Sequence, residues 1–135
     1  MKINGNCQCG KITFCAEANP ENVHLCHCNE CQTISGSPFR WSVTVSESDY
    51  QLLSGMPKIF VKKISSEGYE SHQVFCPDCA SPLYATSNRP GPRNFHVRLG
   101  TVEERAQFVP RKQYWHEENQ SWIYKLNDVP AVNGE

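Results

Sequence analysis

The sequence predicts a mainly β fold, built as a single domain over residues 1–135. Short runs in which apolar and polar residues alternate are typical of half-buried strands. Turn-forming residues separate these runs at frequent intervals, and the only candidate helices are brief. A chain of 135 residues can bury a modest core, so one domain accounts for its length.

The elements can be placed along the chain from this pattern. A strand is predicted around Trp41, Val43 and Val45, which alternate with polar residues after the turn-prone segment 35–38. Residues 58–64 and 69–75 are predicted to form a hairpin around a turn at 65–68. Three further short strands are predicted at residues 82–85, 95–99 and 121–126. The candidate helices lie at residues 28–34 and 102–106, and the segment 87–92 is predicted to be a loop.

Charge and hydropathy exclude several classes of partner. The net charge is −1, and the 13 basic and 14 acidic residues are interspersed, so no patch for nucleic acid or for a membrane surface is expected. No apolar run approaches the roughly 20 residues that span a bilayer. The polar N-terminal residues do not resemble a signal sequence, and we therefore expect a soluble, cytoplasmic protein with reduced thiols. The sequence leaves the oligomeric state open.

Seven of the eight cysteines fall into three tight clusters. These are Cys7 with Cys9, then Cys26, Cys28 and Cys31, then Cys76 with Cys79. Thiols one or two residues apart can converge on one cation, whereas such close neighbours rarely form disulfides with each other. The clusters therefore indicate metal sites.

The number of thiols suggests how they are shared. A closed tetrahedral zinc site takes four ligands, and an open, reactive site takes three. Pairing the outer clusters assigns Cys7, Cys9, Cys76 and Cys79 to a structural site. This leaves Cys26, Cys28 and Cys31 for a second zinc with a free position, which we expect to be the catalytic site.

Two alternatives to this partition remain. A disulfide framework would require an oxidising compartment, for which the N-terminal residues give no indication. A single metal site with spare buried cysteines is the other alternative, because free cysteine is a common core residue. Cys15 lies apart from the clusters in an apolar alternation, and we predict a buried or half-buried thiol there, without a metal.

The same residues resemble a known family. Three motifs together resemble those of the glutathione-dependent formaldehyde-activating enzyme family, also called the CENP-V/GFA domain. They are Cys7-Gln8-Cys9-Gly10, the Cys26–Cys31 cluster with Ser35-Gly36-Ser37, and Phe75-Cys76-Pro77-Asp78-Cys79 with Ser81-Pro82-Leu83. Leu99-Gly100-Thr101-Val102, Pro110 and the Trp122 segment fit the later part of its pattern, so the resemblance covers essentially the whole chain.

The resemblance implies an Mss4-like folded β-sheet with two zinc ions, one structural and one catalytic and labile. It assigns the structural ion to Cys7, Cys9, Cys76 and Cys79, and the catalytic ion to Cys26, Cys28 and Cys31. The implied activity is that of a carbon–sulfur lyase, in which the thiol of glutathione adds to formaldehyde to give S-hydroxymethylglutathione. A zinc held by three thiolates suits such chemistry, because it can present an incoming thiol as a thiolate nucleophile.

Residues outside the cysteine clusters are weaker candidates. Ser35, Gly36 and Ser37 form a turn after the metal segment that can bring backbone N–H groups to a ligand, or can simply lead into the next strand. His27 lies between two ligands and should point away from the side that they share. It is a possible proton carrier or a packed side chain. Glutathione carries two carboxylates, so a binder should offer cationic or backbone donors near the metal. The weak candidates are Arg40, Arg89, Arg93 and Arg98, although most arginines on a small domain are simply solvated.

Two other functions compete with the lyase. A non-enzymatic zinc module for protein interaction is one, and it would not need a second, labile zinc. A redox enzyme similar to the B-type methionine sulfoxide reductases is the other. It ranks lower, because those enzymes hold their structural zinc with two Cys-x-x-Cys pairs, and the first pair here is Cys7-Gln8-Cys9.

Overall fold

Two β-sheets packed face to face form the protein, and the computed structural model describes all residues 1–135. The small sheet has the order β1 (Lys2–Asn6), β2 (Thr13–Glu17), β5 (Tyr50–Ser54), with antiparallel pairing throughout. The large sheet has seven strands in the order β10 (Lys112–Tyr114), β3 (Val23–Cys26), β4 (Arg40–Ser46), β9 (Asn94–Arg98), β8 (Pro82–Ser87), β7 (Glu70–Phe75) and β6 (Lys58–Ile64). Only β10 and β3 pair in parallel. The predicted mainly β fold is confirmed.

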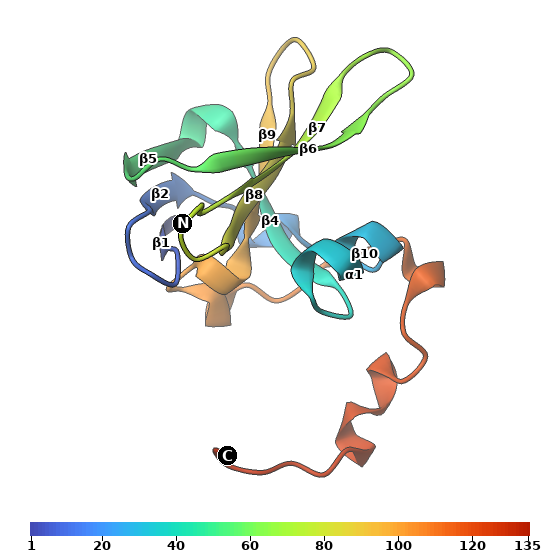
Figure 1. Cartoon of the computed structure of the whole chain (residues 1–135). Coiled ribbons are helices and arrows are strands. Elements are labelled where there is room, and N and C mark those ends of the chain that lie inside the picture. Colours follow the sequence, from blue (N-terminus) through green and yellow to red (C-terminus); the bar gives the residue numbers. More distant parts are fainter.

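Helical structure is confined to short segments (Figure 1). The one α-helix is α1 (Asn29–Ser35), close to the predicted segment 28–34. Short 3₁₀ segments occur at η1 (Pro20–Asn22), η2 (Glu47–Asp49), η3 (Leu99–Thr101), η4 (Arg105–Gln107), η5 (His116–Glu118) and η6 (Ile123–Asp128). None of these helices is long and apolar enough to cross a bilayer.

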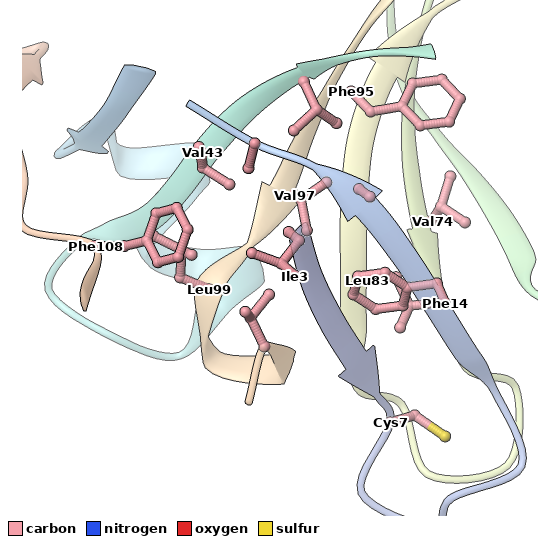
Figure 2. Close-up of a cluster of buried hydrophobic side chains, with 14 of the residues drawn as sticks. Ile3, Cys7, Phe14, Val43, Val74, Leu83, Phe95, Val97, Leu99 and Phe108 are labelled. Carbon is pink, nitrogen blue, oxygen red and sulfur yellow. The ribbon is translucent and has the colours of Figure 1, made fainter. Parts of the chain in front are cut away.

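The core lies between the two sheets. Ile3 and Phe14 from the small sheet pack with Val43, Leu83 and Val97 from the large one, all of them at most 1% exposed (Figure 2). Burying apolar area of this kind is the main stabilising contribution to folding. One close approach in this core requires glycine: Gly5 lies opposite Phe14 in the β1–β2 pair, and a Cβ at Gly5 would lie 2.1 Å from the Phe14 ring.

The opposite face of the large sheet is polar. Residues directly opposite each other in antiparallel strands share a face. The pairs that connect this face are Cys26↔Arg40, Ser42↔Arg98, Thr44↔His96, His96↔Ala85 and Ala85↔Gln73. We call this surface, from Cys26 on β3 to Gln73 on β7, the polar face. It connects strands far apart in the sequence.

The hairpin predicted at residues 58–75 is confirmed as β6 and β7, and the loop predicted at 87–92 lies between β8 and β9. The strand predicted at residues 121–126 is wrong, because this segment forms η6. The segment pairs with no strand of either sheet, and local bonds serve instead, such as Lys125 N–H to the Trp122 carbonyl at 2.8 Å. Figure 1 shows this C-terminal segment extending away from the sheets.

The helix predicted at residues 102–106 is reduced to the single turn η4. The start of the predicted segment is used by the small sheet instead, because Val102 forms a β-bridge to Gly5. The N–H of Glu103 also donates to the carbonyl of Asn4, at 2.9 Å. These two contacts hold the segment after η3 against β1.

Candidate metal centres

Four cysteines from two distant segments meet at one end of the sheets. Cys7 and Cys9 lie in the loop between β1 and β2, and Cys76 and Cys79 lie in the turn between β7 and β8. All four sulfur atoms lie within 4.8 Å of one another. A Zn–S bond of about 2.3 Å places sulfurs of a tetrahedral site about 3.8 Å apart. The Cys7–Cys9 and Cys9–Cys76 sulfurs are 3.5 Å and 3.8 Å apart, so the four-cysteine site can hold a zinc ion.

The backbone around this site supports negatively charged sulfurs. The N–H of Ile12 donates to Cys7 Sγ at 3.3 Å, and the N–H of Cys9 approaches Cys79 Sγ at 3.5 Å. Hydrogen bonding from Ser81 lowers the pKa of Cys79 to about 5. A thiolate, not a thiol, is the metal ligand, so these donors favour the ligating form. All eight cysteines are free in this structure.

The second cluster comes from one short segment. Cys26 ends β3, Cys28 is the N-cap of α1, and Cys31 lies in the first turn of that helix. The side chain of Cys28 accepts the Cys31 N–H at 3.3 Å, as a capping residue does. This local geometry brings three sulfurs within 4.8 Å of one another, and no other Cys, His, Asp or Glu joins the group. The three-cysteine site therefore offers three ligands where a closed zinc site has four.

The three thiols of this site perturb one another. Hydrogen bonding from Cys31 lowers the pKa of Cys26 to about 5, and Cys28 and the charge of Arg40 act in the same direction. The same contact raises the pKa of Cys31. Two adjacent thiolates therefore disfavour each other, and a bound cation would relieve this repulsion.

Two arginines without acidic partners lie next to these thiols. Arg40 is directly opposite Cys26 in the β3–β4 pair, and its Nε is buried without a hydrogen-bond partner. Arg98 is 5% exposed, and its guanidinium donates only to neutral groups, namely Ser42 Oγ, Gln73 Oε1 and the His96 carbonyl. Neither guanidinium forms an ion pair with a carboxylate. A buried charge is costly without a counter-charge. Burial lowers the pKa of Arg98, and the negative charges of Cys31 and Cys26 oppose that effect.

His27 is a packed side chain in this structure. It is 1% exposed, its Nε2 is 2.7 Å from Gln113 Oε1 on β10, and its ring packs edge-on against Phe39. It does not join the metal-binding group, in agreement with the expectation that it points away from the cysteines. Cys15 is half-buried and outside both groups, as expected.

The turn at Ser35, Gly36 and Ser37 ends α1. Gly36 adopts φ 64°, a left-handed conformation that favours glycine, and its N–H donates to the Gln32 carbonyl at 3.0 Å. This N–H is therefore used by the helix itself. The Ser35 hydroxyl is buried without a partner. A ligand-binding role for the three residues stays a prediction.

The sequence-predicted arginines are partly brought together. Arg40, Arg89 and Arg93 line one pocket of about 370 Å³ on the polar face, and Arg98 contacts the Gln73 side chain in its wall. Lys62, Gln73 and His96, which also line this pocket, were not singled out from the sequence. The alternation of side chains along a strand places Gln73 on the same side of β7 as Ser71, which also lines the pocket. This alternation is the sequence signal by which Gln73 could have been found. Neither this pocket nor a larger cavity of about 750 Å³ near η1 is lined by a cysteine.

Comparison with known proteins identifies the family. Residues 2–118 match the family described as "Glutathione-dependent formaldehyde-activating enzyme". The chain belongs to this family. No curated protein matches the chain. The crystal structure of a Rhodobacter sphaeroides protein from a structural genomics programme is similar, with a TM-score of 0.61 and 17% identity over 82% of this chain and 98% of the other. At that identity the similarity supports the fold alone. The resemblance stated from the cysteine motifs is thus confirmed for the family.

Proposed function

We propose that this protein is a zinc-dependent carbon–sulfur lyase that adds a thiol, glutathione above all, to formaldehyde or a related small aldehyde, and cleaves such adducts in the reverse direction. The observation that carries the proposal is the three-cysteine site, which has three convergent sulfurs and no fourth protein ligand. Family membership supports the same reaction.

Both cysteine groups suit zinc. Sites made only of thiolates select soft or borderline ions, and the sulfur spacing of the four-cysteine site matches tetrahedral zinc. We assign a structural role to the zinc of Cys7, Cys9, Cys76 and Cys79, and a catalytic role to that of Cys26, Cys28 and Cys31. Reduced thiols of this kind favour a reducing compartment, so we place the protein in the cytoplasm.

The reaction forms one S–C bond, converts the aldehyde C=O to a C–OH group, and moves the thiol proton to that oxygen. Zinc, when bound, supplies a position at which an incoming thiol loses its proton more easily. Cys26, Cys28 and Cys31 hold that position at the end of β3 and the start of α1. Arg40 supplies positive charge beside the sulfurs, which favours a fourth thiolate, that of the substrate, despite the three already present.

Exchange of ¹³C-formaldehyde between its hydrate and its glutathione adduct, measured by exchange NMR, tests the proposal. The adduct also forms without a catalyst, so the rate of exchange is the quantity to measure. Cys28→Ser should abolish the acceleration and leave the protein folded. Cys15→Ser is the matched control, because Cys15 lies outside both groups, and it should keep full activity. Full activity in Cys28→Ser would refute the assignment.

Counting bound zinc separates the lyase from the non-enzymatic module. Native mass spectrometry should find two zinc ions per chain, one of them lost or converted to a glutathione adduct when glutathione is added. A single zinc that is indifferent to thiol would support the interaction module. Reduction of methionine sulfoxide by the purified protein would support the redox enzyme.

A further inference from the structure

The C-terminal residues carry apolar side chains that nothing in the molecule covers. We call residues 124–135 the tail, and every one of them is exposed. Leu126 and Val129 are more than half exposed, and Val132 is 82% exposed. The backbone bonds of the tail are local, such as Val129 N–H to the Leu126 carbonyl at 3.1 Å, and none reaches either sheet. The tail therefore lacks a surface of its own molecule on which to pack.

A second uncovered apolar surface lies on β6. This strand is the last of the large sheet and pairs with β7 on one side only, so one row of its backbone N–H and C=O groups faces outward. Ile59 and Phe60, which point to opposite faces of the strand, are each about half exposed, and Ile64 is 64% exposed. A long apolar edge strand of this kind is a template for the addition of another strand.

The two surfaces are complementary in charge. β6 carries three lysines and no acidic residue. Lys62 pairs with a carboxylate, whereas Lys58 and Lys63 have no acidic partner. In the tail acidic residues outnumber basic ones, and the carboxylates of Asp128 and Glu135 are unpaired. An apolar segment with acidic side chains therefore suits the β6 edge.

The tail does not reach β6 of its own molecule. β10 and β6 are the two ends of the seven-stranded sheet, so six strand spacings place them about 29 Å apart. The tail follows β10, and its first residues belong to η6, which leads away from the sheets (Figure 1). The residues after η6, 129–135, span about 23 Å when fully extended. The tail of a second molecule is not subject to this restriction.

Pairing of β6 with β6 of a second molecule is the competing arrangement, and charge disfavours it. Such pairing would bring the lysines of two edges together, and like charges opposite each other destabilise a strand pair. The tail has no such conflict. Alternate residues of an added strand bond to the sheet, so Val129 and Ala131 can pair with β6 while Pro130, which lacks an N–H, faces outward.

We propose that the tail of one molecule adds as an eighth strand to the β6 edge of a second molecule, and that the exchange is reciprocal. The result is a dimer with two-fold symmetry, in which the same contact forms twice. Each contact covers Val129 and Val132 with the apolar side chains of β6 and places the tail carboxylates near the unpaired lysines. The inference is independent of the lyase proposal, because neither surface contains a metal-binding cysteine.

Sedimentation equilibrium of the zinc-loaded protein tests the inference, and the wild type should form a dimer whose fraction rises with concentration. We expect Val132→Lys in the tail and Ile59→Glu on β6 each to weaken dimerisation by about 100-fold, because each places a repelled charge at two equivalent contacts. Both side chains are more than half exposed, so circular dichroism should show both variants folded. Val109→Lys is the matched control, because Val109 is also more than half exposed but lies outside both surfaces. It should dimerise as the wild type does.

Two further measurements separate tail exchange from pairing of β6 with itself. The double variant Lys58→Gln, Lys63→Gln should weaken a dimer held by the acidic tail, whereas it would strengthen one held by two β6 strands. An excess of a synthetic peptide of residues 124–135 should convert the dimer to monomer by occupying the β6 edge. The same peptide with Val132→Lys should leave the dimer intact.

Several results would overturn the inference. A wild-type protein that stays monomeric up to its solubility limit would do so, as would a dimer that Val132→Lys leaves unchanged. A dimer that becomes tighter in the double lysine variant would show that β6 pairs with its own copy instead. Assemblies that grow beyond two chains would exclude the reciprocal exchange, because a closed two-fold dimer leaves no free tail or β6 edge.

Discussion

The carboxylate of Glu118 accepts the backbone N–H of Asn29 at 2.8 Å, joining η5 to the first turn of α1. The helix has seven residues, too few to be stable alone, so such contacts hold it in place. Gln32 adds two more, from its Nε2 to the carbonyls of His27 at 2.7 Å and Glu118 at 3.0 Å. The segment after β10 therefore supports the helix that carries Cys28 and Cys31.

We expect Glu118→Ala to weaken metal retention at the three-cysteine site alone. An acidic cap at a helix N-terminus contributes about 1 kcal/mol, so zinc release from this site should accelerate by about 5-fold. A chromophoric chelator measures this as the faster of two release phases. Glu117→Ala is the matched control, because that exposed side chain makes no such bond. If the slow phase of zinc release accelerates instead, Glu118 stabilises the four-cysteine site and the prediction is wrong.

Loss of the four-cysteine site should unfold the protein, whereas loss of the three-cysteine site should not. Cys76 is fully buried and joins the β7–β8 turn to the β1–β2 loop through the shared site. A structural zinc contributes about 10 kcal/mol or more to folding, which exceeds the total stability of most small domains. Circular dichroism should show Cys76→Ser unfolded at 25 °C and Cys28→Ser folded. Similar melting temperatures for the two variants would contradict the division of roles.

Gly5→Ala should destabilise the core by about 3 kcal/mol, because the new Cβ would lie 2.1 Å from Phe14 Cζ. Phe14 is 1% exposed and stacks on Tyr50, so its ring cannot move freely. Gly100→Ala is the matched control, with no atom within 4 Å of the added Cβ, and should change stability by about 0.5 kcal/mol or less. Urea unfolding measures both. Phe14→Leu combined with Gly5→Ala should recover part of the loss, and strict additivity of the two would refute the steric explanation.

Stability should fall between pH 7 and pH 5 in part because of His96. Burial lowers the pKa of His96 to about 4, and the charges of His24, Arg40 and Arg98 add to this effect. In the unfolded chain this histidine titrates near pH 6.5, so below that pH the unfolded state binds a proton that the folded state does not. The contribution of neutral His96 to the free energy of unfolding is therefore fully present above pH 6.5 and declines as the pH falls toward 4. The decline from this residue should be about 2 kcal/mol between pH 7 and pH 5.

His96→Asn removes the titrating group and keeps a polar partner for Thr44, whose hydroxyl lies 3.0 Å from His96 Nδ1. Urea unfolding at pH 7, 6 and 5 should show a shallower decline in this variant than in wild-type protein. His116→Asn is the control at an exposed position and should follow the wild type. If the free energy of unfolding of His96→Asn falls with pH as steeply as that of the wild type, the folded state accepts protonated His96 as readily as the unfolded state does, and the prediction is wrong.

The three-cysteine site could be predicted from the sequence because its ligands are local. Cys28 and Cys31 are three residues apart in one helical turn, so their spacing already places both sulfurs on one side. The strands at 58–64 and 69–75 are neighbours joined by a tight turn, and their alternation was enough to predict the hairpin. At residues 121–126 the same kind of reasoning failed, because a short β-rich composition is no sign of pairing, and this segment pairs with no strand and forms η6.

By itself the sequence determined the two cysteine groups that could hold a metal, the mainly β character and the family, because ligand type, spacing and alternation are properties of short segments. Only the tertiary structure decided what surrounds the reactive thiols. The pair of Arg40 with Cys26 follows from the register of β3 against β4, and the bond from Arg98 to Gln73 spans three strands of the sheet. A shift of one residue in either register would turn these side chains to the opposite face, and no local pattern specifies registers between strands so far apart in the chain.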